Sequence, residues 1–321
     1  MAFRWGIMGA GSIAVKFADA VRRTAGCEAA AIASRDLSRA QAFADRFGIG
    51  QAYGSYEEML LRTRPDAVYV AARTNAHAEL TRLCIRHGIP VLCEKAMFTN
   101  SAEARETLMT AREKGVFAME AMWSRFLPAV QEMKRRLDAG AIGEPLYAEL
   151  AIGWKAPDGP GNCFFDPAEG GGAAYDLTVY GYELADYFLG RPDEALEACV
   201  LWDGGVDVTE SVLLRWQNRT PACMAALSGS IVANLDERCV IHGTKGTLLM
   251  PRPHMAEGFV QTMNDGAREE WRDTETVNGF VYEVQEAVRC IRAGLLESPA
   301  VPHDLTLRCA KMFDLINQTK P

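Results

Sequence analysis

The chain has 321 residues, 49% of them apolar and 24% charged, with a formal net charge of −8, and is long enough for two domains with separate cores. The acidic balance argues against nucleic acid or an anionic membrane as the main partner. No apolar stretch reaches the roughly 18 to 20 residues of a membrane span, and the glycine-rich start is more typical of a strand than of a signal peptide, so we expect a cytoplasmic protein.

Short apolar runs alternate with helical patterns up to residue 122. This alternation predicts parallel strands joined by right-handed crossovers, which form a doubly wound sheet. We therefore expect an N-terminal, dinucleotide-binding Rossmann domain over residues 1–122. The predicted strands cover residues 3–8, 28–33, 66–72, 90–93 and 116–122, and the predicted helices cover 12–23, 37–47, 56–62, 76–87 and 101–114.

The second half, residues 123–321, has a different rhythm, because its apolar runs follow one another through short turns. Such runs predict a C-terminal α+β domain with an open, mostly antiparallel sheet that binds the substrate. Helices are few here, so a partner subunit would cover the exposed sheet face, and we expect a homodimer. The predicted strands are 146–153, 195–202, 208–216, 222–231, 238–242 and 246–250, and the predicted helices are about 173–189, 279–293 and 303–318.

A glycine-rich turn joins the first predicted strand to the first predicted helix. Gly9, Gly11 and Ala14 form a GxGxxA pattern, with Ser12 and Ile13 between the last two. The first glycine permits a tight turn, the second lets the backbone approach a diphosphate, and the helix N-terminus favours the anion. We expect these residues to bind a nicotinamide dinucleotide.

The end of the second predicted strand bears on the choice between NADP and NAD. Ser34, Arg35 and Arg39 offer a hydroxyl and two guanidinium groups, which suit the 2′-phosphate of NADP. Asp36 keeps NAD open as the alternative, because a carboxylate here can bind the ribose hydroxyls. Directly before a helix, however, Asp36 is better explained as an N-cap, and NADP is favoured.

Three residues suggest acid–base chemistry. Lys95 follows a predicted parallel strand, where an open α/β sheet presents groups to ligands. Asp176 and Tyr180 are spaced i, i+4 and share one helix face. A tyrosine works as a base near neutral pH only when a cation stabilises its phenolate, and Lys95 could supply that charge. The same helix carries further tyrosines that are alternatives or core residues, namely Tyr175, Tyr182 and Tyr187.

Several segments together carry a family resemblance. They are 9–14, 34–40, 52–58, Glu94-Lys95 after a strand, 120–126 and the helix from Asp176 to Tyr180. The chain resembles the glucose–fructose oxidoreductase / inositol dehydrogenase (Gfo/Idh/MocA) family over essentially its whole length. Within that family it looks most similar to the branch of trans-1,2-dihydrobenzene-1,2-diol dehydrogenase and NADP-dependent D-xylose 1-dehydrogenase.

The resemblance implies roles for individual residues. Lys95 would be the catalytic lysine, with Glu94 near the nicotinamide ribose, and Tyr180 the acid–base residue beside Asp176. The segment with Thr74, Asn75 and His77 would line the nicotinamide side of the cofactor. One departure is Ala96, where the family usually has proline after the lysine. Since a non-proline residue strongly favours a trans bond, we expect Lys95–Ala96 to be trans.

The substrate would be a small molecule, either a sugar or a cyclic vicinal diol. Trp123, Arg125, Trp154 and Phe280 could form an apolar wall with a polar group, or could be core aromatics and a surface arginine. The run Gly170-Gly171-Gly172 suggests close backbone approach to a substrate or cofactor, or a flexible turn.

The leading hypothesis is therefore an NADP-dependent oxidoreductase acting on CH–OH groups. Two alternatives are a glycosidase that uses a retained nicotinamide cofactor, and a non-catalytic regulatory protein that senses NADP or a sugar. A pure sensor has no need of Lys95, Asp176 and Tyr180 together, which favours the enzyme. The nine cysteines contain no CxxC pair and the five histidines are scattered, so we expect no metal site.

Overall fold

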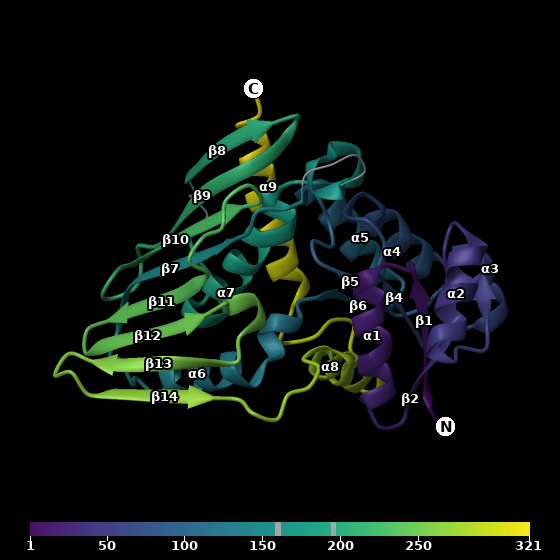
Figure 1. The fold of residues 1–321 in the computed structure, drawn as a ribbon, viewed down its shortest axis with the longest axis horizontal. Helices are drawn as coiled ribbons and strands as arrows, with labels where there is room; N and C mark the ends of the chain where they lie inside the picture. The colour runs from purple at the N-terminus through teal and green to yellow at the C-terminus, as the bar shows by residue number, and fades with distance from the viewer. Residues whose placement is uncertain (158–161, 194–196) are drawn as a thin grey trace. The chain divides into compact units, whose positions relative to one another are not determined.

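The computed structural model describes residues 1–157, 162–193 and 197–321. These residues divide into two compact units (Figure 1). In the described part of the chain, every helix is too short or too polar to cross a membrane. Unit 1 comprises Met1–Trp123 and Asn278–Ala310, and unit 2 comprises Ser124–Val277 and Lys311–Pro321.

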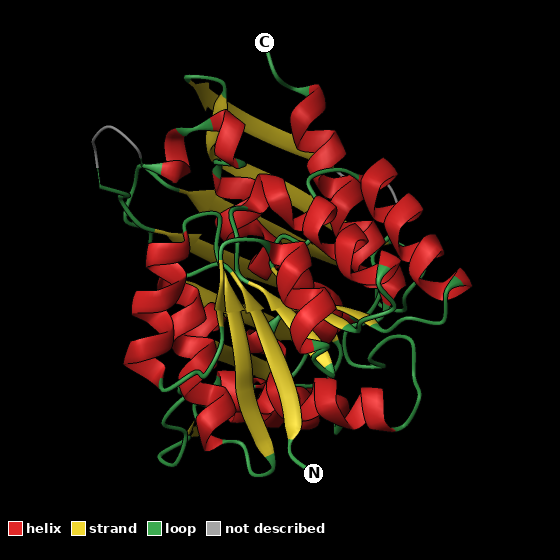
Figure 2. Ribbon diagram, turned by 90° about the vertical axis from the view of Figure 1, so that its right-hand side faces the viewer, coloured by secondary structure: helices red, strands yellow, loops and turns green. Residues whose placement is uncertain are grey.

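Unit 1 is built on a parallel sheet of six strands in the order β3-β2-β1-β4-β5-β6. The order reverses between β1 and β4, and helices flank the sheet on both faces (Figure 2). The strands are β1 (Phe3–Met8), β2 (Cys27–Ala33), β3 (Ala52–Tyr53), β4 (Ala67–Val70), β5 (Val91–Glu94) and β6 (Ala118–Ala121). The helices are α1 (Ser12–Arg23), α2 (Leu37–Phe47), α3 (Tyr56–Thr63), α4 (His77–Arg86), α5 (Ser101–Glu113) and α8 (Phe280–Arg292), with the short turn η1 (Thr74–Ala76).

The central strands of unit 1 form its core. Every residue of β4, β5 and β6 is buried, as expected for parallel strands covered by helices on both faces. Phe17 of α1 stacks on Tyr69 of β4 with ring centroids 3.6 Å apart, and Trp5 packs edge-on against Phe17. This packing holds α1 against the sheet, so the turn that precedes α1 has a rigid base.

Unit 2 is built on a sheet of eight strands in the order β14-β13-β12-β11-β7-β10-β9-β8. Strands β7 and β10 pair in parallel, and the other neighbours pair antiparallel. The strands are β7 (Pro145–Gly153), β8 (Glu197–Asp203), β9 (Val206–Trp216), β10 (Cys223–Ser230), β11 (Arg238–Gly243), β12 (Gly246–Pro251), β13 (Gly258–Met263) and β14 (Arg268–Arg272).

Helices cover one face of the unit 2 sheet. Helix α6 (Pro128–Asp138) packs on β13, and α7 (Val179–Leu189) packs on β7 and β10. A single π-helical turn, η5 (Ala174–Thr178), leads directly into α7. Short 3₁₀ turns also occur in unit 2: η3 (Cys163–Phe165), η4 (Pro167–Glu169) and η6 (Pro253–Met255). The turn η2 (Trp123–Phe126) begins at the last residue of the first segment of unit 1 and continues into unit 2. The last helix, α9 (His303–Gln318), contributes its first residues to unit 1 and its last ones to unit 2.

The expected fold class is confirmed: a doubly wound parallel sheet is followed by a mostly antiparallel one. Strands β3, β13 and β14 and helix α6 were not predicted. The predicted helix at 173–189 begins as the π-helical turn η5 rather than as α-helix. The first two residues of the strand predicted at 195–202 lie outside the described residues, and β8 begins at Glu197.

Candidate active site

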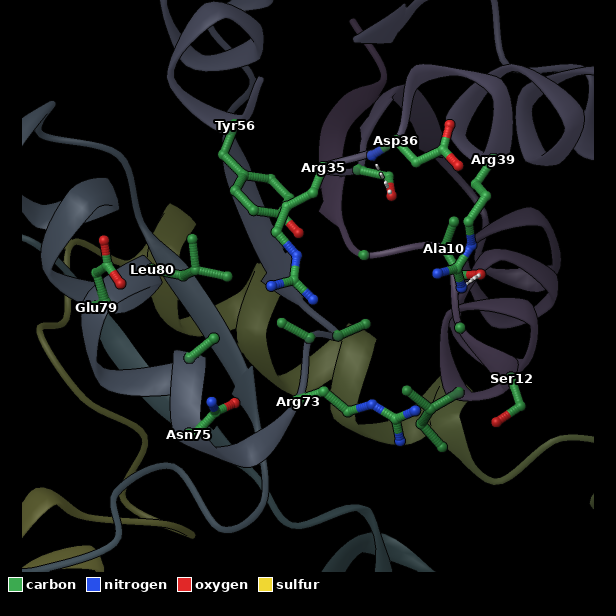
Figure 3. A pocket seen from close by; sticks show the side chains of 17 residues that line it. Ala10, Ser12, Arg35, Asp36, Arg39, Tyr56, Arg73, Asn75, Glu79 and Leu80 are labelled. Carbon is green, nitrogen blue, oxygen red and sulfur yellow. Dashed lines mark hydrogen bonds between the residues drawn. The ribbon is translucent and has the colours of Figure 1, made fainter. Parts of the chain in front are cut away.

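A cavity of about 880 Å³ lies in unit 1, beyond the carboxyl ends of β1, β2 and β4 (Figure 3). This is the switch point of the strand order, where doubly wound sheets bind ligands. Each of the three strands contributes the residues that follow it, and helices α2, α3 and α4 add side chains. The lining residues are Gly9, Ala10, Gly11, Ser12, Ile13, Ser34, Arg35, Asp36, Arg39, Tyr56, Ala71, Ala72, Arg73, Asn75, Ala76, Glu79 and Leu80.

The glycine-rich turn forms one wall of this cavity. Gly9 has a φ of +106°, and a Cβ atom there would lie 2.4 Å from the carbonyl oxygen of Ala71. Its N–H donates to the carbonyl oxygen of Ala33 at 2.8 Å, which ties the turn to β2. Gly11 is the N-cap of α1, whose first turn has no acidic side chain. The N-terminus of α1 therefore offers a diphosphate a positive potential that no acidic side chain of its first turn opposes.

Two arginines from the second strand and helix reach the same cavity. Figure 3 shows the guanidinium group of Arg35 directed into the cavity beside the ring of Tyr56. Arg39 lies over the glycine-rich turn, and its Nη2 donates to the carbonyl oxygen of Ala10 at 3.4 Å. Burial raises the pKa of Tyr56, and the charge of Arg35 opposes that rise. This end of the cavity is suited to an anion.

Asp36 caps helix α2, as its position before the helix predicted. Its Oδ1 accepts from the backbone N–H of Ser38 at 2.8 Å and from the Ser38 hydroxyl at 2.6 Å. These two bonds, that of the hydroxyl first, lower the pKa of Asp36. The carboxylate is thus engaged by its own helix.

Several lining residues were not predicted from the sequence, and four of them have side chains larger than alanine: Tyr56, Arg73, Glu79 and Leu80. In Figure 3 the side chain of Arg73 extends toward the part of the cavity where Ser12 lies. Arg73 follows β4 at the switch point, and this position is the signal that could have identified it. The other three lie on α3 and α4, whose orientation toward the cavity depends on tertiary packing.

Of the three residues expected on the nicotinamide side, only Asn75 lines this cavity. Thr74 opens the turn η1 beside it. His77 is buried, with Nδ1 2.8 Å from the carbonyl oxygen of Ala96 and Nε2 3.1 Å from that of Ala72. Burial lowers the pKa of His77. The imidazole therefore joins two backbone segments and has no ring nitrogen left for a ligand.

Lys95 follows β5, and the expected trans bond between Lys95 and Ala96 is wrong, because the bond is cis. Hydrogen bonds hold the chain on the far side of this bond. The Ala96 carbonyl contacts His77, and the Met97 N–H donates to Oε1 of Glu120 at 2.9 Å. Glu120 is buried and also accepts from the hydroxyl of Thr306 at 2.8 Å. The local preference of Ala96 for a trans bond did not predict this conformation.

Glu94 precedes Lys95 and lies in a buried acidic environment. It is 5% exposed, and one of its carboxylate oxygens accepts from the hydroxyl of Tyr69. Glu283 of α8 is fully buried nearby. Burial, and then the negative charge of Glu94, raise the pKa of Glu283 well above its usual value. Both effects favour the protonated form of Glu283.

The aromatic residues expected at the substrate occur in two contacts. In unit 1, Trp123 stacks on Phe280 with ring centroids 5.0 Å apart and ring planes at 22°. In unit 2, Trp154 meets Phe164 edge to face at 5.1 Å. Aromatic contacts of both kinds occur in core packing and in binding sites for sugars or rings.

Arg125 is not exposed but buried in unit 2, at 3% of its accessible surface. Its Nη1 lies 3.5 Å from Oε2 of Glu183, and its Nη2 lies 3.5 Å from Oδ1 of Asp186. The guanidinium group also lies over the ring of Tyr187 at 4.8 Å. All three partners are on α7, so Arg125 secures that helix.

The same helix carries the expected acid–base residues of unit 2. Asp176 lies in the π-helical turn η5, and Tyr180 lies in the first turn of α7. Tyr180 is largely buried, and its ring centroid lies 5.6 Å from that of His254. The change from π- to α-helical geometry between Asp176 and Tyr180 decides how the two side chains are oriented.

A doubly wound sheet with a glycine-rich turn at its switch point defines a dinucleotide-binding protein. Residues 3–122 match the family model "Oxidoreductase family, NAD-binding Rossmann fold", and residues 130–249 match the "GFO/IDH/MocA C-terminal domain". The chain belongs to the GFO/IDH/MocA oxidoreductase family, as the sequence motifs predicted.

Known relatives agree with this assignment. The trans-1,2-dihydrobenzene-1,2-diol dehydrogenase of Mus musculus is 35% identical over 314 residues, which cover 94% of this chain and 92% of that protein. The human enzyme of the same name is 31% identical over the same shares. A 3-ketoreductase from Actinomadura kijaniata, solved with NADP and TDP-benzene, is 26% identical and superposes with a TM-score of 0.87 over 99% of this chain and 98% of its own. The expected dehydrogenase class is confirmed.

Proposed function

We propose that this protein is an NADP-dependent dehydrogenase that transfers hydride between the hydroxyl-bearing carbon of a sugar or cyclic vicinal diol and the nicotinamide. The observation that carries the proposal is the cavity at the switch point, with its glycine-rich turn and two arginines. The named relatives support the substrate class, since they are similar to this chain over nearly its full length and are named as dehydrogenases of a dihydrodiol.

The side chains that follow β2 in the cavity favour NADP over NAD. Ser34, Arg35 and Arg39 supply a hydroxyl and two cations where the adenosine 2′-phosphate would lie. Asp36 would repel that phosphate if it pointed inward, but its carboxylate is bonded to Ser38. The similar ketoreductase was solved with NADP.

The residues of unit 1 fit a dinucleotide. Gly9 packs closely against the carbonyl oxygen of Ala71, where a Cβ atom would clash, and the N-terminus of α1 favours the diphosphate. Asn75 would contact the nicotinamide half, with Thr74 and Glu94 beside it, and His77 would act through the carbonyl groups it holds. The bound nicotinamide would supply the hydride chemistry.

The proton chemistry belongs to the chain itself. Tyr180 would take the hydroxyl proton during oxidation and return it to a carbonyl oxygen in the reverse direction. Lys95 would polarise that oxygen and stabilise the tyrosinate by its positive charge. Asp176, one turn before Tyr180, would orient it or hold a substrate hydroxyl.

Trp123, Phe280 and Trp154 would provide apolar walls for the substrate. The contacts of Arg125 with α7 favour a supporting role there over direct contact with the substrate. In this scheme residues 1–122 bind the dinucleotide, and residues 123–321 bind the substrate and form the oligomer.

A homodimer through the open sheet is part of the proposal. The strand register places four exposed apolar side chains on one face of the unit 2 sheet, opposite the face that α6 and α7 cover. They are Leu201, Leu213, Met224 and Leu249. A second copy of the chain could bury this face.

We also propose a cytoplasmic location, in keeping with reduced cysteines.

The direct test is an absorbance assay at 340 nm with NADP⁺ or NAD⁺ against D-xylose, D-glucose, myo-inositol and a cyclic trans-diol. We expect NADP⁺ reduction with at least one substrate, and its loss in both Lys95→Ala and Tyr180→Phe. Nicotinamide that stays with the purified protein without net reduction would favour the glycosidase. Binding without turnover would favour the regulatory protein.

A further inference from the structure

Two carboxyl groups of unit 2 lie buried side by side on β9, and neither belongs to the site described above. Asp207 is 3% exposed and Glu210 is 1% exposed. No lysine or arginine is paired with either of them among the ion pairs of the described residues. Buried carboxyl groups without a cation are costly, so their contacts require an explanation.

The pair holds both ends of the π-helical turn η5. The backbone N–H of Ala174, the first residue of η5, donates to Oδ2 of Asp207 at 2.6 Å. The hydroxyl of Thr178, the last residue of η5, donates to Oε1 of Glu210 at 2.5 Å. Between these two attachments lies Asp176, and Tyr180 follows two residues after the second.

Two glycines make room for these contacts. A Cβ atom on Gly172, whose φ is +127°, would lie 2.1 Å from Oδ1 of Asp207. A Cβ atom on Gly229 of β10 would lie 2.0 Å from the Thr178 hydroxyl oxygen and 3.2 Å from Oε1 of Glu210. The close approach that the glycine run at 170–172 suggested is therefore to the carboxylate of Asp207.

The two carboxyl groups differ in what they accept. Asp207 accepts a backbone N–H, which stabilises its ionised form, whereas Oε2 of Glu210 faces no hydrogen-bond donor. Burial, and then the charge of Asp207, raise the pKa of Glu210 well above its usual value. Burial and the neighbouring carboxylate therefore favour the protonated form of Glu210, which can donate to Asp207.

We propose that Asp207 and Glu210 share one proton and act as positioning residues, which hold the π-helical turn so that Asp176 and Tyr180 are oriented for proton transfer. The proposal rests on the proposed function of Tyr180. A π-helical turn is a rare conformation that often occurs at functional sites, and here both of its ends are bonded to this pair.

The test compares Glu210→Gln with Glu210→Ala and Asp207→Asn. Glutamine replaces a protonated glutamate well, because its NH₂ can donate to Asp207 while its oxygen accepts from Thr178. We expect Glu210→Gln to keep kcat within about threefold, and the other two variants to lose about 10- to 100-fold in kcat, since small misplacements have effects of that size. The Kd for NADPH, measured by fluorescence titration, should change little. Asp203→Asn, an exposed carboxylate at the end of β8, is the matched control.

Equal kcat values in all the variants would overturn the proposal, and so would equal losses in Glu210→Gln and Glu210→Ala. Hydrogen exchange of the amides at 173–180 gives a readout without turnover: it should accelerate in Glu210→Ala but not in Glu210→Gln, and unchanged exchange in both contradicts the proposal. A wild-type protein without dehydrogenase activity would refute the proposed function and leave this exchange test valid. If Glu210→Ala does not fold, Thr178→Val removes the hydrogen bond from Thr178 to Glu210. This variant should then show the lower kcat and the faster exchange at 173–180 that are expected of Glu210→Ala.

Discussion

The imidazole of His77 holds the carbonyl oxygen of Ala96, with Nδ1 and that oxygen 2.8 Å apart. Ala96 follows Lys95 directly, and the other ring nitrogen faces the carbonyl oxygen of Ala72 on the cavity wall. A neutral imidazole can donate to only one of these oxygens, and burial disfavours the charged ring that could donate to both. His77 thus connects the cavity to the segment that carries Lys95, and burial favours its neutral form.

The buried His77 should make stability depend on pH. Burial lowers the pKa of His77 in the folded state. As the pH falls through about 6.5, the unfolded chain therefore binds a proton at His77 that the folded chain does not bind. Stability therefore falls as pH decreases below that value, by up to about 1.4 kcal/mol per pH unit. Urea unfolding between pH 7.5 and 5.5 should show a shallower pH dependence in His77→Gln. The exposed His242 is the control, and an equal change in His242→Gln would contradict the assignment.

Arg35 and Arg39 should decide cofactor choice. Removing either guanidinium group leaves the 2′-phosphate with one cation, so we expect the KM for NADP⁺ to rise about 10-fold for each alanine variant, with little change for NAD⁺. The double variant should prefer NAD⁺ or lose its preference. Arg46→Ala removes an arginine from the last turn of the same helix, away from the cavity, and should behave like the wild type. A fully retained NADP⁺ preference in the double variant would refute the phosphate site.

Gly9→Ala should abolish cofactor binding and destabilise unit 1. The added Cβ atom would lie 2.4 Å from the Ala71 carbonyl oxygen, in addition to the strain of a positive φ. Gly48 also has a positive φ, +70°, but a Cβ atom there meets nothing within 4 Å, so Gly48→Ala measures the backbone strain alone. We expect about 1 kcal/mol of destabilisation for Gly48→Ala and clearly more for Gly9→Ala. Similar losses for the two variants would mean that the close approach at Gly9 relaxes easily.

The open sheet should mediate dimer formation. Leu213 and Met224 lie on adjacent strands, β9 and β10, and are exposed on the same face. Leu213→Glu and Met224→Glu would each place a charge in the proposed interface. Sedimentation analysis should show a dimer for the wild type and a shift toward monomer for either variant. Leu61→Glu, an exposed leucine of α3 in unit 1, is the control. A monomeric wild type would exclude this interface.

The parallel sheet of unit 1 could be predicted because its signals are local. Its buried strands are short and mainly apolar, and Gly48, Gly88 and Gly115 end helices with a positive φ. Strand β3 has only two residues, Ala52 and Tyr53, which is too short for a periodic pattern. Strand β14 has four charged residues out of five, so at the sheet edge it shows no apolar alternation.

Contacts between distant residues account for what the sequence did not predict. The residues that follow the cis bond are bonded to His77 of α4 and to Glu120 of β6. The hydrogen bond from the Ala174 N–H to Asp207 joins residues that are 33 positions apart. Neither relationship has a signature in local spacing. The cavity side chains that directly follow strands were the ones that topology made predictable.

The stability of an Arg125→Ala variant distinguishes two roles for Arg125, substrate binding and structural support of α7. Its guanidinium group is buried against Glu183 and Asp186, so Arg125→Ala would remove a buried cation from beside two carboxyl groups of α7. Removing one partner of a buried ion pair typically destabilises a protein by about 3 to 5 kcal/mol. Guanidinium unfolding should therefore show a large loss of stability. Arg135→Ala, which breaks an exposed pair with Glu132 on α6, should cost less than about 1 kcal/mol.

Kinetic measurements on the same Arg125→Ala variant also distinguish the two roles. If Arg125 supports α7, kcat should fall together with stability, and the loss should be partly recovered at lower temperature, where more of the protein is folded. If it binds substrate directly, the KM for the substrate should rise while the unfolding midpoint stays near that of the wild type. The second result would contradict the buried geometry, because a side chain only 3% exposed has almost no surface left with which to contact a ligand.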